Sequence, residues 1–108
     1  MKSSRSSLLE ALFIQNDILG RARAQYLAKD AEKKHFEANL ILNAPGSSMA
    51  ERKVNAEALG VYLEFHQALA RLEAIYEFQK LKFEVMSKEW QDSYLERKLD
   101  QGLISKQE

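Results

Sequence analysis

The chain has 108 residues, 16 basic and 16 acidic side chains, and no cysteine. Its length allows one small domain, and its formal net charge of zero removes the strongest argument for non-specific binding to nucleic acid. The lack of cysteine excludes disulfides, thiolate metal ligands and thiol nucleophiles, and it is compatible with a cytoplasmic location.

The first seven residues are basic and serine-rich, and we expect residues 1–7 to form a flexible tail. Ser7 and Glu10 have the spacing of a capping box, in which the serine hydroxyl accepts from the third amide of a helix and the glutamate returns to the serine amide. They predict a first helix over about residues 8–42. Because polar residues at 10 and 15–17 interrupt its apolar run, we expect neither a signal peptide nor a membrane span. The apolar face of this helix consists of Leu8, Leu12, Leu19, Ala22, Tyr26, Phe36 and Leu40.

A turn is predicted over residues 43–47, because Pro45 pushes the preceding residue out of the helical region and Gly46 tolerates a positive φ. Ser48 and Glu51 repeat the capping-box spacing directly after it. They predict the start of a second helix over about residues 49–98, weakened only at Gly60. A second flexible tail is expected over residues 99–108.

The second helix carries apolar residues at seven-residue intervals, in one row from Tyr62 to Trp90 and a partner row from Phe65 to Met86. This pattern indicates a coiled-coil-like seam. The predicted fold class is therefore all-α, with two long antiparallel helices forming a helical hairpin. Folding at the turn places Leu8 opposite the region of Phe83, so that the rest of the second helix overhangs.

The predicted overhang leaves large apolar side chains in water, which is unusual for a monomer. We therefore expect oligomerisation to complete the fold, with a second copy of the chain as partner. The residues predicted to form the oligomer interface are Tyr62, Phe65, Leu69, Leu72, Tyr76, Phe83, Met86, Trp90 and Tyr94.

No motif for catalysis stands out in the sequence. Glu32 and His35 have the Glu-x-x-His spacing of carboxylate-bridged di-iron bundles, but the other histidine, His66, has Leu63 three residues before it. The sequence also has no Gly-x-Ser-x-Gly elbow and no phosphate-binding glycine loop. We expect no enzyme activity, metal, cofactor or small-molecule substrate.

Basic residues form two candidate sites for nucleic acid. The first flanks the predicted turn, where an oligomer would repeat its charges around a common surface. The second interleaves lysines with aromatic residues, as in proteins whose cations follow the phosphates of a single strand. The alternative, an ordinary solvated face with pairs between residues i and i+4, stays open. The candidate residues are Lys33, Lys34, Arg52, Lys53, Lys80, Lys82 and Lys88.

The segment from Val54 to Lys98, which includes Tyr-Glu-Phe-Gln-Lys at 76–80, is a long aromatic-rich helix after a broken loop. In this layout the chain resembles the recombination mediators of T-even phages. The resemblance implies a non-catalytic protein that forms ring-shaped oligomers, binds single-stranded DNA and helps load a recombinase onto strands covered by single-strand-binding protein. It also implies the cytoplasm of a bacterial host as the location, and it implies no role for any individual residue.

A protein-only function is the alternative. A secretion chaperone, an inhibitor or an assembly adaptor would use the overhanging apolar seam to hold a partner helix in a groove. Binding of single-stranded DNA at two salt concentrations distinguishes these functions, because phosphate-driven binding weakens steeply as salt rises.

Overall fold

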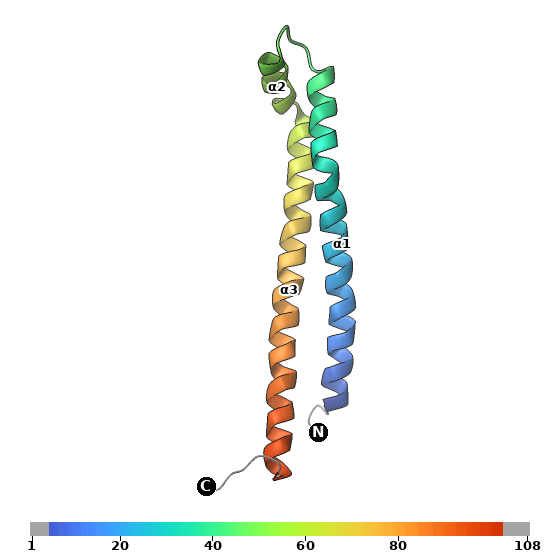
Figure 1. The fold of residues 1–108 in the computed structure, drawn as a ribbon, viewed down its shortest axis with the longest axis vertical. Helices are drawn as coiled ribbons and strands as arrows, with labels where there is room; N and C mark the ends of the chain where they lie inside the picture. The colour runs from blue at the N-terminus through green and yellow to red at the C-terminus, as the bar shows by residue number, and fades with distance from the viewer. Residues whose placement is uncertain (1–4, 103–108) are drawn as a thin grey trace. The chain divides into compact units, whose positions relative to one another are not determined.

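The computed structural model describes residues 5–102 and contains three helices in that range: α1 (Arg5–Asn43), α2 (Met49–Glu57) and α3 (Gly60–Asp100) (Figure 1). These described residues include no strand, so the predicted all-α class is confirmed. None of these helices has both the length and the apolar character needed to cross a membrane.

The chain divides into two compact units. The central unit comprises residues 22–76. The terminal unit comprises residues 1–21 together with 77–108, and its described residues are 5–21 and 77–102. Helices α1 and α3 contribute to both units, whereas α2 belongs to the central unit alone.

Within each unit, α1 and α3 form an antiparallel pair (Figure 1). In the central unit, the ring of Phe36 stacks on Phe65 with centroids 4.2 Å apart, and the ring of Tyr26 stacks on Tyr76 with centroids 5.8 Å apart. The order of these contacts reverses between the two helices, as antiparallel pairing requires. The predicted helical hairpin is confirmed, and its completion by oligomerisation stays a prediction.

Side chains that turn toward the opposite helix recur at alternating intervals of three and four residues, as in a coiled coil. We term these the core positions, and every residue at them is buried or half-buried. The residues predicted for the apolar face of the first helix and for the oligomer interface all occupy core positions, except Tyr94. The core positions of α1 are Leu8, Leu12, Gln15, Leu19, Ala22, Tyr26, Lys29, Lys33, Phe36 and Leu40. Those of α3 are Tyr62, Phe65, Leu69, Leu72, Tyr76, Gln79, Phe83, Met86, Trp90 and Ser93.

The continuous second helix predicted over 49–98 is wrong, because residues 58–59 divide it into α2 and α3. The amide of Leu59 donates to the carbonyl of Ala56 at 3.1 Å, a three-residue bond that tightens and ends α2. Gly60 begins α3, and its low helix propensity favours an interruption at this point. Figure 1 shows α2 leaving the axis of α3 within the central unit.

The separate helix α2 also shifts the register of the hairpin. Folding directly at the turn places Phe36 opposite about residue 55, whereas its ring stacks on Phe65. The shift arises because α2 and its flanking loops together connect α1 to α3, so pairing begins later along α3.

Both predicted tails are partly helical. α1 begins at Arg5, so Ser7 lies inside the helix, and the prediction of Ser7 as its N-cap is wrong. Residues 5–7 can form the first turn of α1 because the amides of a first turn have no partner within the helix. At the other end, α3 continues to Asp100 and a turn follows at 101–102. The remaining parts of the predicted tails, 1–4 and 103–108, lie outside the described residues.

The two units differ in what they bury. Among residues 5–102, every buried apolar side chain lies in the central unit. The described part of the terminal unit buries one residue, the polar Gln15, which is 2% exposed. The fully buried apolar side chains are Ala22, Ala44, Ala56, Phe65 and Leu69, whereas the apolar core positions of the terminal unit, such as Leu12 and Phe83, are half-buried.

Candidate interaction surfaces

The loop between α1 and α2 is held at the start of α2 by hydrogen bonds to side chains. The amide of Glu51 donates to Ser48 Oγ at 3.1 Å, which confirms Ser48 as the N-cap of α2. The Glu51 carboxylate does not return to the Ser48 amide as predicted. It accepts instead from the amide of Ser47 at 2.6 Å and from Ser47 Oγ at 3.0 Å. These bonds, led by the one from the Ser47 amide, lower the pKa of Glu51.

Arg52 and Asn55 bind the carbonyl groups of the same loop. Arg52 Nε donates to the carbonyl of Gly46 at 3.1 Å, and Asn55 Nδ2 donates to that of Pro45 at 2.6 Å. Gly46 has a φ of 149°, and a Cβ there would lie 3.0 Å from the backbone nitrogen of Arg52. Arg52, which the sequence predicts as a nucleic-acid contact, therefore also has a structural role in this loop.

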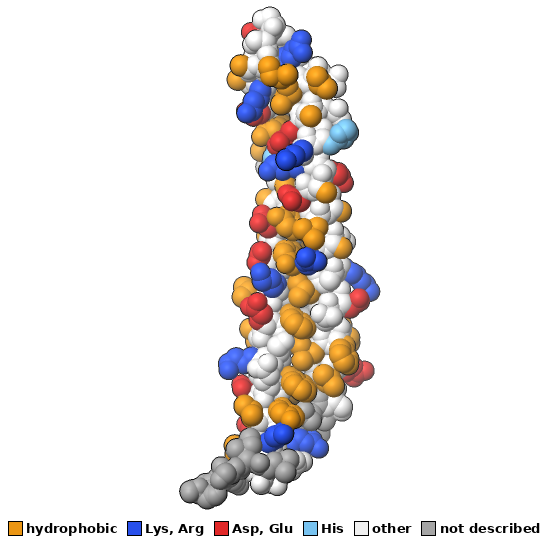
Figure 2. All heavy atoms as spheres, in the orientation of Figure 1, with side chains coloured by type: hydrophobic (Ala, Val, Ile, Leu, Met, Phe, Trp, Pro, Cys, Tyr) orange, Lys and Arg blue, Asp and Glu red, His pale blue; other side chains and the backbone are white. Residues whose placement is uncertain are grey.

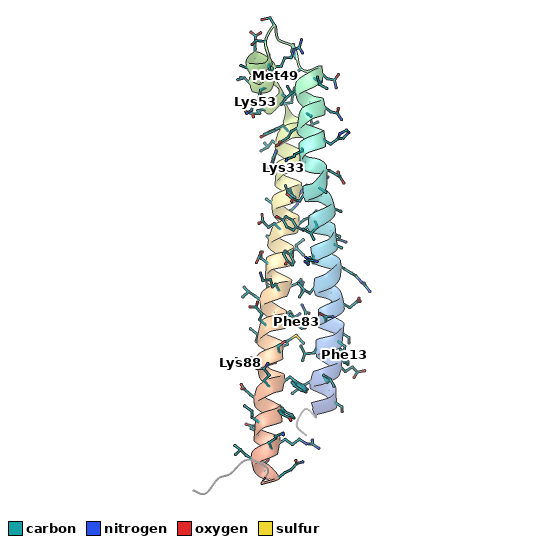
Figure 3. The ribbon with its side chains drawn as sticks, viewed as in Figure 1. Phe13, Lys33, Met49, Lys53, Phe83 and Lys88 are labelled. Carbon is teal, nitrogen blue, oxygen red and sulfur yellow. The ribbon has the colours of Figure 1, made fainter. Side chains whose placement is uncertain are left out.

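The basic group predicted near the turn belongs to the central unit. Lys34 of α1 and Lys53 of α2 are exposed, whereas Lys33 occupies a core position of α1 and is half-buried (Figure 3). Lys33, which the sequence predicts as a nucleic-acid contact, thus lies in the seam between α1 and α3. Within residues 5–102, no ion pair involves Lys33, Lys34, Arg52 or Lys53.

The second predicted basic group belongs to the terminal unit. Lys80, Lys82 and Lys88 are exposed on α3, and Figure 3 shows Lys88 on the side away from α1. Lys80 Nζ lies 3.8 Å from a carboxylate oxygen of Glu77, and Lys88 Nζ lies 3.9 Å from one of Asp92. These acids on the same helix partly balance two of the three charges. The structure therefore distributes the seven candidate residues between two units.

Eight of the nine residues predicted for the oligomer interface occupy core positions of α3, from Tyr62 to Trp90. There they face α1 within the same chain. Tyr94 follows the core position held by Ser93, and its ring stacks on Trp90 with centroids 5.7 Å apart. Burial raises the pKa of Tyr62, and nearby acidic side chains add to the effect. A role for these residues between chains stays a prediction.

Polar residues complete the seam, and sequence reasoning missed them. Lys29 Nζ lies 4.7 Å from the centroid of the Phe65 ring, as in a cation–π contact. His66 Nε2 and Glu37 Oε2 are 2.8 Å apart, and both side chains are less than a third exposed. For Lys29 the available signal was the spacing of three and four, which continues through polar residues, whereas Glu37 and His66 lie beside that spacing and are brought together by the pairing of the helices.

The terminal unit exposes large apolar side chains from both of its helices. Figure 3 shows Phe83 directed between α1 and α3, whereas Phe13, which is 68% exposed, lies on the outer side of α1. Figure 2 shows apolar side chains reaching the surface among charged ones on the face it presents. The exposed large apolar residues in the described part of this unit are Leu9, Phe13, Ile14, Ile18, Phe78, Leu81, Val85, Tyr94, Leu95 and Leu99.

A shallow hollow of about 540 Å³ lies along the C-terminal part of α1, beside Glu32, His35 and Asn39. His35 Nε2 lies 3.2 Å from Asn39 Nδ2, and no group of three metal-ligating side chains gathers anywhere in residues 5–102. No protein-family model, curated protein or solved structure matches the chain.

Proposed function

We propose that this protein is a non-catalytic helical module that binds another protein through the terminal unit. One observation carries the proposal. In its described part, the terminal unit leaves its apolar core positions only half-buried, and it exposes large apolar residues from both helices. Burial of apolar surface contributes roughly 25 cal/mol per Å², so a protein that covers these side chains would add apolar burial that the unit reaches only in part by itself.

The charge of the chain supports a protein partner. Its 16 basic and 16 acidic residues balance, and in the terminal unit Arg21, Lys80 and Lys88 each pair with a carboxylate on their own helix. Interfaces between proteins combine an apolar centre with such a polar rim. The proposal corresponds to the protein-only function that the sequence analysis gives as the alternative. The difference is that the outward-facing apolar side chains, and not the seam, would contact the partner.

Site-specific photocrosslinking in cells tests this proposal. Phe78, which is 61% exposed in the terminal unit, is replaced by p-benzoylphenylalanine, and crosslinked proteins are identified by mass spectrometry. The matched control carries the same photoreactive residue in place of the exposed Lys34 in the central unit. We expect one defined protein crosslink from position 78 and none from position 34. If position 78 yields no protein crosslink, the proposal is wrong.

A second candidate function is binding of single-stranded DNA, as the sequence resemblance implies. The observation in its favour is that Lys33, Lys34 and Lys53 form no ion pair within the described residues. Cations without direct partners are free to bind phosphates, and repetition in an oligomer would raise the avidity of weak single contacts. A role in loading a recombinase depends on this binding and would be tested after it.

A further inference from the structure

The N-terminal part of α1, residues 6–19, is held against α3 by few buried groups, and we term it the arm. Its large apolar side chains are either half-buried at core positions or exposed. The half-buried ones are Leu8, Leu12 and Leu19, and the exposed ones are Leu9, Phe13, Ile14 and Ile18. Pairing with α3 therefore removes only part of the apolar surface of the arm from water, which limits the hydrophobic contribution to this pairing.

The buried residue of the arm is polar. Gln15 is 2% exposed, and its Nε2 donates to Oε1 and to the carbonyl of Gln79 in α3. The net contribution of such hydrogen bonds is modest, because water offers the same bonds when the two groups separate. The contacts between the arm and α3 thus combine half-buried leucines with a polar pair, and both are lost more readily than fully buried apolar contacts.

Gly20 lies directly after the arm, inside α1. The terminal unit ends one residue later along α1, at Arg21. A Cβ on Gly20 would meet no atom within 4 Å, so packing does not require a glycine at this position. A glycine inside a helix is about two- to fivefold less favourable than an alanine. The weakest point of α1 by helix propensity therefore coincides with the inner end of the terminal unit.

An exposed ion pair spans Gly20. Arg21 Nη2 lies 2.7 Å from Asp17 Oδ2, and the two side chains are 75% and 62% exposed. The pair needs helical backbone between its two residues, so it favours an unbent helix across the glycine. Ion pairs with this exposure contribute little to stability and are screened by salt. The pair therefore opposes bending at Gly20 only weakly.

We infer that Gly20 is a hinge about which the arm moves away from α3, while α1 and α3 stay paired within the central unit. The inference goes beyond the proposed function, because it concerns a motion of the chain itself and needs no partner. In the open form, core positions of α3 that face the arm become accessible, among them Phe83, Met86 and Trp90. The bond between Gln15 and Gln79 re-forms on closing and restores the register.

Double electron–electron resonance between spin labels measures this motion. Because the chain has no cysteine, labels attach only at introduced ones. Glu10→Cys with Gln91→Cys places labels at exposed positions of the arm and of α3. Ala31→Cys with Gln67→Cys is the matched control at exposed positions of α1 and α3 in the central unit. With unlabelled chain in excess to remove distances between copies, we expect two distances for the first pair and one for the control pair.

Substitutions at the hinge test its position. Gly20→Ala is expected to lower the population with the longer distance about two- to fivefold, because bending would then interrupt a better helix former. Gly60→Ala adds the same methyl group in similarly open surroundings outside the terminal unit, and it should leave that population unchanged. Arg21→Gln removes the ion pair across the hinge and should raise the population by up to about twofold.

Trp90 gives a second readout that needs no label. It is the only tryptophan of the chain, and it is half-buried at a core position of α3. Quenching of its fluorescence by acrylamide should be weaker in Gly20→Ala than in the original protein and stronger in Arg21→Gln. Helical circular dichroism should stay unchanged in both variants.

The outcomes separate the motion from the place of the hinge. A single distance for the arm pair, as narrow as that of the control pair, would overturn the motion. If Gly20→Ala and Gly60→Ala changed the longer-distance population equally, the bend would lie elsewhere and the hinge at Gly20 would be wrong. Neither result bears on the proposed function, which the crosslink from position 78 tests separately.

Discussion

Gln15 and Gln79 form a polar pair between the two helices of the terminal unit. Gln15 Nε2 donates to Gln79 Oε1 at 2.7 Å and to the Gln79 carbonyl at 3.2 Å, and Gln15 is 2% exposed. Both residues occupy core positions in rows that are otherwise largely apolar. A polar residue at such a position fixes the register of a coiled coil at a cost in stability. We interpret this pair as the register device of the terminal unit.

Replacing one member of the pair is expected to destabilise the protein. Gln15→Ala leaves the half-buried Gln79 side chain without its partner, which should lower the free energy of unfolding by about 1–3 kcal/mol. Gln15→Leu combined with Gln79→Leu should restore or exceed the original stability, because neither polar group is then left unsatisfied. Urea unfolding followed by circular dichroism measures both. A double variant less stable than Gln15→Ala would contradict the role assigned to the pair.

The cap of α2 should make stability depend on pH. The folded-state pKa of Glu51 lies below its ordinary value of 4.5, chiefly because the Ser47 amide donates to it. The stability that the ionised carboxylate contributes is therefore present above about pH 4.5 and is lost as the pH falls through the lowered folded-state value. We expect the stability difference between the original protein and Glu51→Gln to shrink as acid is added. A difference that stays constant from pH 7 to about pH 3 would argue against this bond.

Gly46 should tolerate no side chain. Gly46→Ala forces a Cβ to 3.0 Å from the Arg52 backbone nitrogen at a φ of 149°, and we expect a loss of more than about 1 kcal/mol. Gly20→Ala is the matched control, because that position is inside α1 with no atom within 4 Å of the added Cβ. This control should stabilise the protein by about 0.5–1 kcal/mol. Thermal unfolding of the two variants gives shifts of opposite sign if the loop has the conformation described.

If the protein binds single-stranded DNA, the contact should depend on Lys34 and Lys53. The double variant Lys34→Glu and Lys53→Glu is expected to abolish binding of a labelled oligonucleotide in fluorescence anisotropy, with helicity unchanged. Arg52 is retained because its guanidinium binds the loop. For about three phosphate contacts, affinity of the original protein should fall roughly 20-fold between 50 and 200 mM salt. Lys80→Glu with Lys88→Glu is the control, since both lysines already lie near acids.

The part of the fold that follows local rules could be predicted from the sequence. The seven-residue rows of α3, the turn at Pro45 and Gly46 and the cap at Ser48 each depend on neighbours a few residues away. The division of α2 from α3 could not be predicted in this way. A glycine at position 60 only weakens a helix, and the interruption depends on how α2 packs within the central unit.

The candidate surfaces were harder to predict because they depend on pairing. Exposure of Phe78 and burial of Phe65 follow from which flank of α3 meets α1, although both residues are phenylalanines on one helix. Arg52 has the charge of a phosphate ligand, and only its bond to the Gly46 carbonyl reveals its structural role. Gln15 and Lys29 were missed because a search for apolar residues passes over polar residues in the same register.

The fuller burial of apolar side chains in the central unit implies an order of folding. The contacts near the loop close short stretches of chain, since Glu37 and His66 are 29 positions apart in the sequence, whereas Gln15 and Gln79 are 64 positions apart. Short closures lose less chain entropy and form sooner. The folding nucleus should therefore form in the central unit near α2, and the helices of the terminal unit should pair afterwards. Substitutions near the loop would slow folding, and those in the terminal unit would mainly accelerate unfolding.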